Sequence, residues 1–177
     1  LNAPKGMALV KNTLWVSDLD EVTAIDIKTG KITKRIKIDG AGFLNDVAAD
    51  AKGTVYVSDS KTKKVHKIEN GKATVLLENL SGPNGLLVHN KELYVLDNGT
   101  FNKVSKDNKL QQLASGLEGH TDGIENVQGD EFIVSGWEGV IYYVKANGES
   151  QKLLDTRDQK INSADIGYDA TNKIVYV

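Results

Sequence analysis

The stretch "SGPNGLLVHNKELYVLD", from Ser81 to Asp97, decides the fold because its outline recurs along the chain. Residues 43–59 ("FLNDVAADAKGTVYVSD") and residues 120–136 ("HTDGIENVQGDEFIVSG") have the same outline. In each, a turn leads into a short apolar strand, then a polar turn and a second strand. A recurrence of this kind indicates a protein built from structural repeats.

The second strand of each repeat carries a bulky side chain at one position. These positions are separated by 41, 38, 39 and 43 residues. The side chains in this column are Trp15, Tyr56, Tyr94, Ile133 and Tyr176. We expect its four aromatic members to be mostly buried between neighbouring sheets.

Each repeat has room for two further strands, joined by tight turns such as Asn70-Gly71 and Asn147-Gly148. Asn-Gly favours a hairpin in which both central residues have positive φ. Four strands in each ~40-residue repeat are typical of a β-propeller blade. The sequence therefore predicts an all-β propeller of four-stranded antiparallel blades, with about four complete blades and part of a fifth. A β-sandwich is the alternative, but it does not predict so regular a period.

The whole chain, residues 1–177, is predicted to be a single propeller domain that is incomplete at both ends. It stops inside the apolar strand "KIVYV", and an unclosed blade leaves strand edges unpaired. We expect it to be part of a longer, six-bladed ring. The alternative is a short chain that closes its ring by oligomerising.

Composition and net charge limit the classes of partner that the chain is expected to bind. The net charge is −2 and the pI is about 5.9, so nucleic acid is not expected as a partner. The basic run from Lys61 to Lys67 is interrupted by Val65, lies in a predicted hairpin and is interpreted as a solvated strand face. No stretch has the ~20 apolar residues of a membrane span, and no signal peptide is recognised. There is no cysteine. An extracytoplasmic or periplasmic location is slightly favoured, and the oligomeric state is not predicted.

The first residue of each innermost strand is predicted to border the central channel, because chain direction alternates within a blade. This column holds Lys5, Asn45, Asn84, Asp122 and Ala164. The next column holds Gly6, Asp46, Gly85, Gly123 and Asp165. Three consecutive repeats thus bring two carboxamides and a carboxylate to one rim. Such hard oxygen donors suit Ca²⁺ or another hard divalent cation. The alternative is that Asn and Asp before Gly are only turn formers.

Other side chains near this rim are candidates for chemistry or recognition. If the chain is extended there, His120 shares a side with Asp122 and could act as a general base or bind a lactone; the alternative is a loop residue. Trp137 could stack on a sugar ring, although packing between blades is the favoured interpretation. Asp18, Asp59 and Asp97, which end the second strands, are expected to bond backbone groups of the following loops and to add negative potential. Lys5 would repel a cation if it pointed inward.

The motifs around Asn45, Asn84 and Asp122 resemble those of the senescence marker protein/gluconolactonase/luciferin-regenerating-enzyme-like family of six-bladed propellers. The resemblance implies that these residues hold a divalent cation, often calcium, together with a glutamate from the first blade. It also implies a catalytic role for Asp122 in the hydrolysis of sugar lactones or related esters. Two departures stand out: Asn45-Asp46 is followed by Val47 rather than glycine, and no glutamate candidate is found in this chain.

Two functions from different classes follow. The first is a metal-dependent hydrolase of lactones or esters, with Asp122 as base or nucleophile and His120 as a proton carrier. The second is a non-catalytic NHL-type propeller that binds a protein, a glycan or a small ligand on its rim, because such propellers share the repeat and some of the turns.

Overall fold

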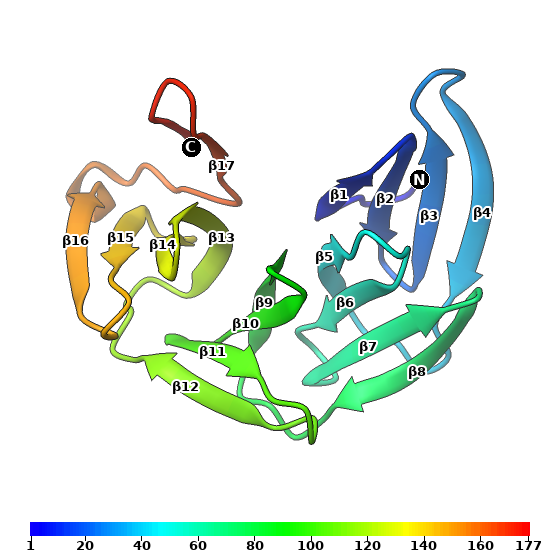
Figure 1. Ribbon diagram of the computed structural model, residues 1–177, viewed down its shortest axis with the longest axis horizontal. Coiled ribbons are helices and arrows are strands. Elements are labelled where there is room, and N and C mark those ends of the chain that lie inside the picture. Colours follow the sequence, from blue (N-terminus) through cyan, green and yellow to red (C-terminus); the bar gives the residue numbers. More distant parts are fainter.

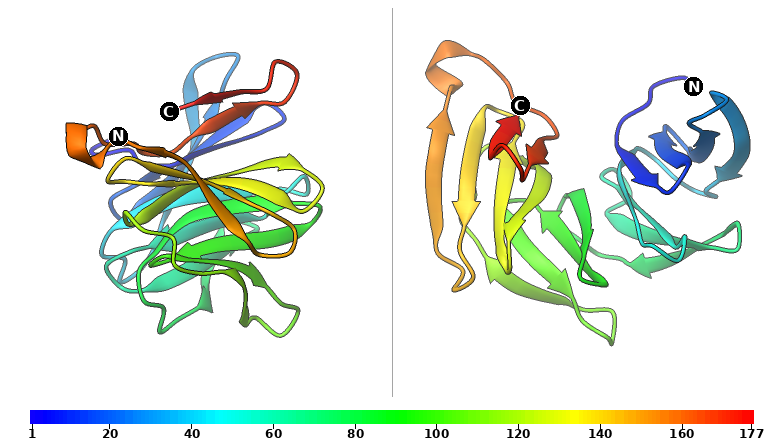
Figure 2. Two further views of the ribbon diagram at one scale, coloured as in Figure 1. Left: turned by 90° about the vertical axis from the view of Figure 1, so that its left-hand side faces the viewer. Right: turned by 45° about the horizontal axis from the view of Figure 1, so that its top comes forward.

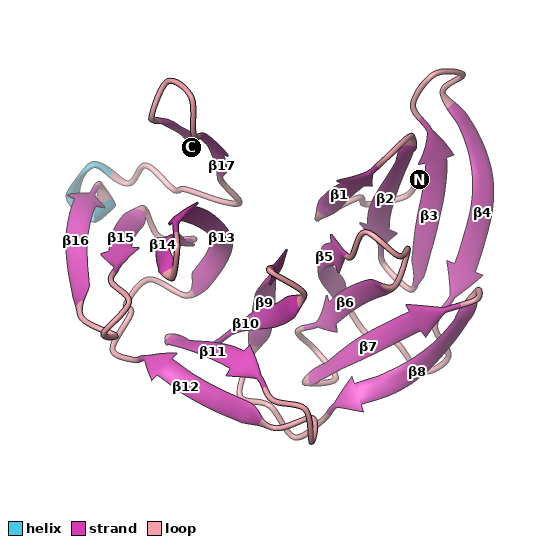
Figure 3. Cartoon of the chain, in the orientation of Figure 1, coloured by secondary structure: helices cyan, strands magenta, loops and turns pink.

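The computed structural model describes residues 1–177, and strands dominate it (Figure 3). Four four-stranded sheets are followed by a two-stranded sheet, and all strand pairing is antiparallel between sequence neighbours. The single helix is a 3₁₀ turn, η1 (Arg157–Gln159). The predicted all-β propeller architecture is therefore confirmed.

The sheets follow one another along the chain as blades. The first is β1 (Met7–Val10), β2 (Thr13–Asp18), β3 (Glu21–Asp26) and β4 (Lys31–Lys37). The second is β5 (Leu44–Ala49), β6 (Val55–Asp59), β7 (Lys64–Glu69) and β8 (Lys72–Leu77). The third is β9 (Pro83–His89), β10 (Glu92–Asp97), β11 (Thr100–Val104) and β12 (Leu110–Ala114). The fourth is β13 (Thr121–Gln128), β14 (Glu131–Gly136), β15 (Val140–Val144) and β16 (Ser150–Asp155), and the fifth is β17 (Gly167–Asp169) with β18 (Ile174–Tyr176).

The blades stand around a central axis, with the first strand of each blade innermost and the fourth outermost (Figures 1 and 2). The inner strands β1, β5, β9 and β13 contact one another in sequence. The blades form an arc, and β1 and β17 face each other across its opening (Figure 1). A closed four-bladed ring is thus not seen, and a longer six-bladed ring stays a prediction.

Tight turns between the third and fourth strands set the strand register. At Asn70-Gly71 the φ angles are 52° and 78°, as predicted for a hairpin with two positive φ values. The same prediction is wrong at Asn147-Gly148, where only Gly148 has a positive φ, of 87°. There the Gly148 amide donates to the Lys145 carbonyl, and the Lys145 amide donates to the Glu149 carbonyl, so the loop is one residue wider.

The hydrophobic core lies between neighbouring blades, where the facing sides of adjacent sheets pack together. The largest apolar cluster joins the third and fourth blades around three aromatic rings. The ring of Phe132 lies 4.9 Å from the ring centroids of both Tyr94 and Phe101. Smaller clusters join the other adjacent pairs of blades. Blade-to-blade packing therefore fixes the inner strands relative to one another.

The aromatic column is buried less uniformly than the sequence predicts. Tyr94 is buried, whereas Trp15 and Tyr56 are half-buried against the clusters of their own blades. For Tyr176 the prediction is wrong, because its side chain lies in the two-stranded sheet and is 60% exposed. No further sheet packs on that face of β18 to cover it.

The aspartates that end the second strands fasten the loops around the first strands. Asp59 accepts backbone N–H bonds from Gly42 and Phe43 before β5, and from Lys61 and Thr62 after β6. The sequence predicts the bonds to the following loop, but it does not predict the bonds to the preceding loop. Asp18 and Asp97 likewise accept from the loops that precede β1 and β9. Each aspartate holds the start of an inner strand against the end of the next strand.

Replacing Asp59 with alanine is expected to lower the free energy of unfolding by about 2 kcal/mol, because four amide donors lose a charged acceptor. Urea denaturation followed by circular dichroism measures the change. Asp26→Ala is the matched control, since Asp26 accepts similar bonds in an exposed turn where water can replace it. Equal losses for both variants would contradict a special role for the Asp59 anchor.

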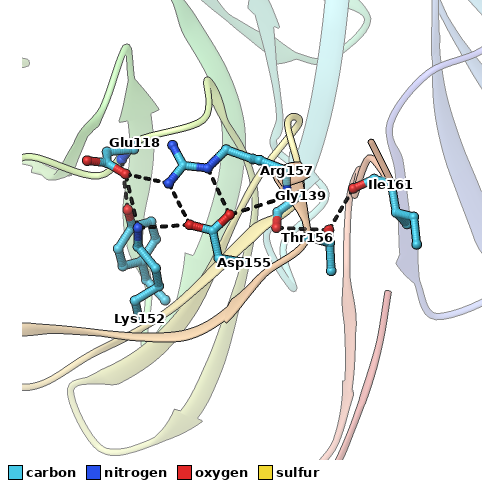
Figure 4. A network of polar contacts seen from close by, with 8 residues as sticks. Glu118, Gly139, Lys152, Asp155, Thr156, Arg157 and Ile161 are labelled. Atoms are coloured by element: carbon cyan, nitrogen blue, oxygen red, sulfur yellow. Dashed lines mark hydrogen bonds and ion pairs between the residues drawn. The ribbon is translucent and has the colours of Figure 1, made fainter. Parts of the chain in front are cut away.

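A surface network closes the outer edge of the fourth blade (Figure 4). Asp155, at the end of β16, pairs with Lys152 and Arg157, and both cations also pair with Glu118 before β13. These charges are exposed, and exposed pairs contribute little to stability. The network ties the end of β16 to the loop that precedes β13.

Regarding membranes, no helix in the structure combines the length and the apolar character that a membrane span needs.

Candidate functional site at the channel rim

The three predicted donors lie at the beginning of three adjacent inner strands. Asn45 is in β5, Asn84 in β9 and Asp122 in β13. All three sit within strands, so the alternative that they only form turns does not describe their positions. They line one cavity of about 440 Å³. The other lining residues are Lys5, Phe43, Ser60, Gly82, Asn98, His120, Thr121 and Trp137.

Glycines beside this column let the inner strands approach closely. Gly85 has no positive φ, yet a Cβ placed there would lie 2.0 Å from the backbone oxygen of Asp122. At Gly6 and Gly123 the neighbouring atom is instead an aspartate Oδ1, of Asp46 at 2.3 Å and of Asp165 at 2.5 Å. The glycines therefore make room for the next blade's carboxylate or backbone.

Serines of the second strands connect neighbouring inner strands. The Ser135 hydroxyl accepts from the Gly123 amide at 2.8 Å and donates to the Ala164 carbonyl at 2.6 Å. Ser17 bridges the Gly6 amide and the Asn45 carbonyl in the same way. Sequence reasoning missed this bridge, although the repeated Ser-Asp ending of "WVSD" and "VYVSD" was its signal. The bridge locks the spacing of the column that carries the candidate donors.

Asn45 and Asn84 each have a carboxamide oxygen that accepts no hydrogen bond. The Asn45 Nδ2 donates to the Ser60 hydroxyl at 3.1 Å, and that hydroxyl donates to the Pro83 carbonyl at 2.7 Å. The bond to Ser60 occupies the Nδ2 of Asn45 and leaves its Oδ1 free to contact another partner. The Asn84 Oδ1 is completely buried and has no hydrogen-bond partner. A buried acceptor without a donor is costly, so its presence at a cavity requires an explanation.

Asp122 is the titratable member of the predicted trio, and its pKa is shifted. Burial and, secondarily, the nearby charge of Asp165 raise the pKa of Asp122 to about 6, while the Asn84 side chain opposes the rise. Desolvation also raises the pKa of Asp165, although this residue is exposed in the structure, so the effect of burial on it is small. The carboxylates of Asp122 and Asp165 repel one another, and a cation placed between them would relieve that repulsion.

Two further acids face the same channel, and sequence reasoning gave neither of them a role. Asp46 is buried between blades, where its two oxygens accept from the Val47 and Leu86 amides. Its pKa is raised by burial and by Asp165. Glu125 lies three residues after Asp122 in β13. Burial and, to a smaller extent, the charge of Asp165 raise the pKa of Glu125 to about 7. For Asp46 the available signal was its register, which it shares with Asp165; at the position of Glu125 no other repeat has an acid.

His120 and Trp137 line the cavity on the side of the fourth blade. His120 has a φ of 52°, so the extended conformation that was expected to align it with Asp122 is not present. Its Nδ1 lies 2.7 Å from the Glu138 carboxylate, and its side chain is largely exposed. Trp137 is 51% exposed, and its amide donates to the His120 carbonyl. Both residues border the same space as Asp122, and their roles in catalysis or stacking stay predictions.

Lys5 lies at the opposite side of the cavity, on the first blade. Its amide donates to the Ser17 carbonyl, which fixes the backbone at the entrance of β1. Its ammonium lies 5.3 Å from the centroid of the Phe43 ring. Lys5 also borders a smaller neighbouring cavity of about 150 Å³, together with Asp46, Asp122 and Asp165.

No three His, Cys, Asp or Glu side chains cluster in a way that suits a metal ion. The candidate trio contains a single residue of these types, because two of its members are asparagines. A cation site around Asn84 and Asp122 would therefore use carboxamide oxygens beside a single carboxylate.

Several solved structures have the same arrangement of blades. A catalytically inactive variant of virginiamycin B lyase from Staphylococcus aureus, crystallised with quinupristin, matches 94% of this chain with a TM-score of 0.78 and 15% identity. A structural-genomics target assigned as a gluconolactonase matches 96% with a TM-score of 0.74 and 16% identity. A chain of a nidogen/laminin complex matches 92% with a TM-score of 0.62 and 13% identity. At such identities the likeness shows the propeller fold alone.

The chain spans 60% of the length of the lyase it matches, 68% of the gluconolactonase-assigned chain and 83% of the chain from the nidogen/laminin complex. No family model matches the sequence, and no curated protein matches it. The fold is thus shared with a lyase, a protein assigned as a gluconolactonase and a chain of the nidogen/laminin complex.

Proposed function

We propose that this chain belongs to a divalent-cation-dependent hydrolase of lactones or related esters, with the cation held at the channel rim by Asn45, Asn84 and Asp122. The observation that carries the proposal is the buried, unpartnered Oδ1 of Asn84 beside a carboxylate whose pKa is raised to about 6. Both line one cavity with Asn45. A hard cation is the partner that explains an orphaned oxygen and an uncompensated carboxylate together.

The donor set fits such an ion chemically. Two carboxamide oxygens and one carboxylate oxygen are the ligands that calcium prefers, and Ser60 already orients the Asn45 amide with its oxygen free. A bound cation would supply Lewis-acid polarisation of a carbonyl oxygen. Ca²⁺ takes six to eight oxygens, so water, substrate and the predicted glutamate would complete its shell.

The residues of the chain supply the remaining chemistry. Asp122 in its ionised form accepts a proton from water, whose oxygen then attacks the carbonyl carbon of the ester. Direct attack by the Asp122 carboxylate on that carbon is the alternative. With water as the nucleophile, the ring oxygen leaves, takes up a proton, and the product is a hydroxy acid. With Asp122 as the nucleophile, the ring oxygen leaves in the same way and an acyl-aspartate anhydride forms, which a water molecule then hydrolyses to release the hydroxy acid and regenerate the carboxylate. His120, held at the cavity edge by Glu138, is the candidate that delivers this proton.

Calcium titration calorimetry on the full-length protein tests the cation site, with Asn84→Leu as the variant. Leucine matches asparagine in size but has no oxygen donor, so calcium affinity is expected to fall by about 100-fold. Asn84→Asp is the matched rescue, because it keeps an oxygen at the same place and should retain calcium binding. Lactone and ester hydrolysis is measured in parallel, with and without a chelator.

Calcium affinity that is the same in wild type, Asn84→Leu and Asn84→Asp would contradict the cation site. Hydrolysis that persists after chelation would contradict the dependence on a cation.

A binding propeller without catalysis is the second candidate function. It is compatible with the fold, which a chain of the nidogen/laminin complex also has, 83% of that chain being covered. Calcium binding that depends on Asn84, combined with no turnover on any lactone or ester, would support this candidate over the hydrolase.

A further inference from the structure

We infer that Lys5 makes the rim cavity selective for ligands that carry an anionic group, so that the substrates are lactones or esters bearing a carboxylate. This inference rests on the proposed function for the lactone or ester. It adds the charge of the substrate and names Lys5 as the residue that binds the charged group.

Lys5 stands on a rigid base. Its amide donates to Ser17, and the next amide, of Gly6, donates to the Ser17 hydroxyl at 3.0 Å and to the Asn45 carbonyl at 3.1 Å. Its ammonium takes part in none of the ion pairs of the structure. It rests over the Phe43 ring, which orients a cation without neutralising it. The positive charge is therefore available to a ligand.

The cavity is charged asymmetrically around this ammonium. Asp122 lines it with Asn45 and Asn84, and Lys5 lines it together with Phe43. Trp137 offers an exposed ring face on the side of the fourth blade, while the neighbouring His120 is already paired with Glu138. Lys5 therefore supplies the positive charge of the lining that is not already paired with a carboxylate. A ring that lies against Trp137 with its carbonyl towards Asp122 would carry an anionic substituent to Lys5.

A matched pair of probes tests this assignment on the full-length protein in calcium-containing buffer. γ-Carboxy-γ-butyrolactone is ionised at neutral pH, and γ-hydroxymethyl-γ-butyrolactone is its neutral counterpart with the same ring. Binding is read by calorimetry immediately after mixing, whether or not the lactone is later hydrolysed. Wild type is expected to bind the carboxylated lactone about tenfold more tightly, as a charge-assisted contact at a partly exposed site provides.

Lys5→Gln is expected to remove this preference, Lys5→Arg to keep it, and added salt to weaken it. Lys34→Gln is the matched control, because Lys34 lies on the outer strand β4, away from the cavity, and the same charge is removed. Equal affinity for the two lactones in wild type, a preference that Lys5→Gln leaves intact, or no binding of either lactone would each overturn the assignment. Calcium-dependent hydrolysis of the neutral lactone alone would overturn it while leaving the proposed function in place.

Discussion

In the Asp122→Asn variant of the full-length protein, lactone hydrolysis is expected to fall by about 10³-fold while the fold is retained. Asparagine has the shape of aspartate but can neither accept a proton from water nor attack a carbonyl. The same change removes the only carboxylate of the candidate cation site, so calcium affinity falls as well. Initial rates at saturating calcium, together with calcium titration, separate the two losses.

Stability is expected to move in the opposite direction. The folded protein raises the pKa of Asp122 to about 6, above its unfolded value of 3.8, so ionised Asp122 destabilises the fold at neutral pH. Without calcium, Asp122→Asn should therefore unfold at the same temperature as wild type or a higher one. With calcium, wild type should gain stability and the variant should not. A functional site that costs stability behaves in this way.

Asp165→Asn is the control for this experiment. It removes a neighbouring charge that contributes to the raised pKa of Asp122, but it removes none of the three candidate ligands. Its hydrolysis rate is expected to stay within a few-fold of wild type. Turnover and calcium affinity that are equal in wild type and Asp122→Asn would remove Asp122 from both roles.

The fold could be predicted from the sequence because a propeller repeats one local pattern. The period of the aromatic column and the Asn-Gly turns depend on neighbours within a blade, which are close in sequence. Burial of Tyr176 could not be predicted in the same way, since it depends on whether another sheet packs on β18. The wider loop at Asn147 is closed by two backbone hydrogen bonds, from Gly148 to Lys145 and from Lys145 to Glu149, and the Asn-Gly pair alone does not distinguish it from the two-residue turn.

The candidate site could be predicted only as a column of positions. Register alone brings Asn45, Asn84 and Asp122 to one cavity, because equivalent residues of successive blades face one axis. The conformation of His120, with its positive φ, and the free ammonium of Lys5 over Phe43 depend on contacts between blades. The acids Asp46 and Glu125 gain their raised pKa values from burial in three dimensions, which the sequence pattern does not contain.

The close approach of the inner strands leads to the second large expected effect. Gly85→Ala is expected to lower the free energy of unfolding by about 3 kcal/mol, the upper part of the usual range for overpacking. The new Cβ would lie 2.0 Å from the Asp122 carbonyl oxygen and 2.9 Å from the Leu96 Cδ1. Backbone strain is not the cause, because Gly85 has no positive φ. Strands β9 and β13 have to separate to admit the methyl group.

Separation of these strands moves Asn84 and Asp122 apart, since each residue is adjacent to the point of contact. Calcium affinity should therefore fall together with the unfolding midpoint in urea, although no donor atom is removed. Gly167→Ala is the matched control: Gly167 is also a strand glycine without positive φ, and no atom lies within 4 Å of its new Cβ. That variant should be as stable as wild type or slightly more stable, because alanine in a strand loses less backbone entropy than glycine on folding. Equal unfolding midpoints for Gly85→Ala and Gly167→Ala would show that the inner strands can move apart freely, and a cation site defined by their spacing would then be untenable.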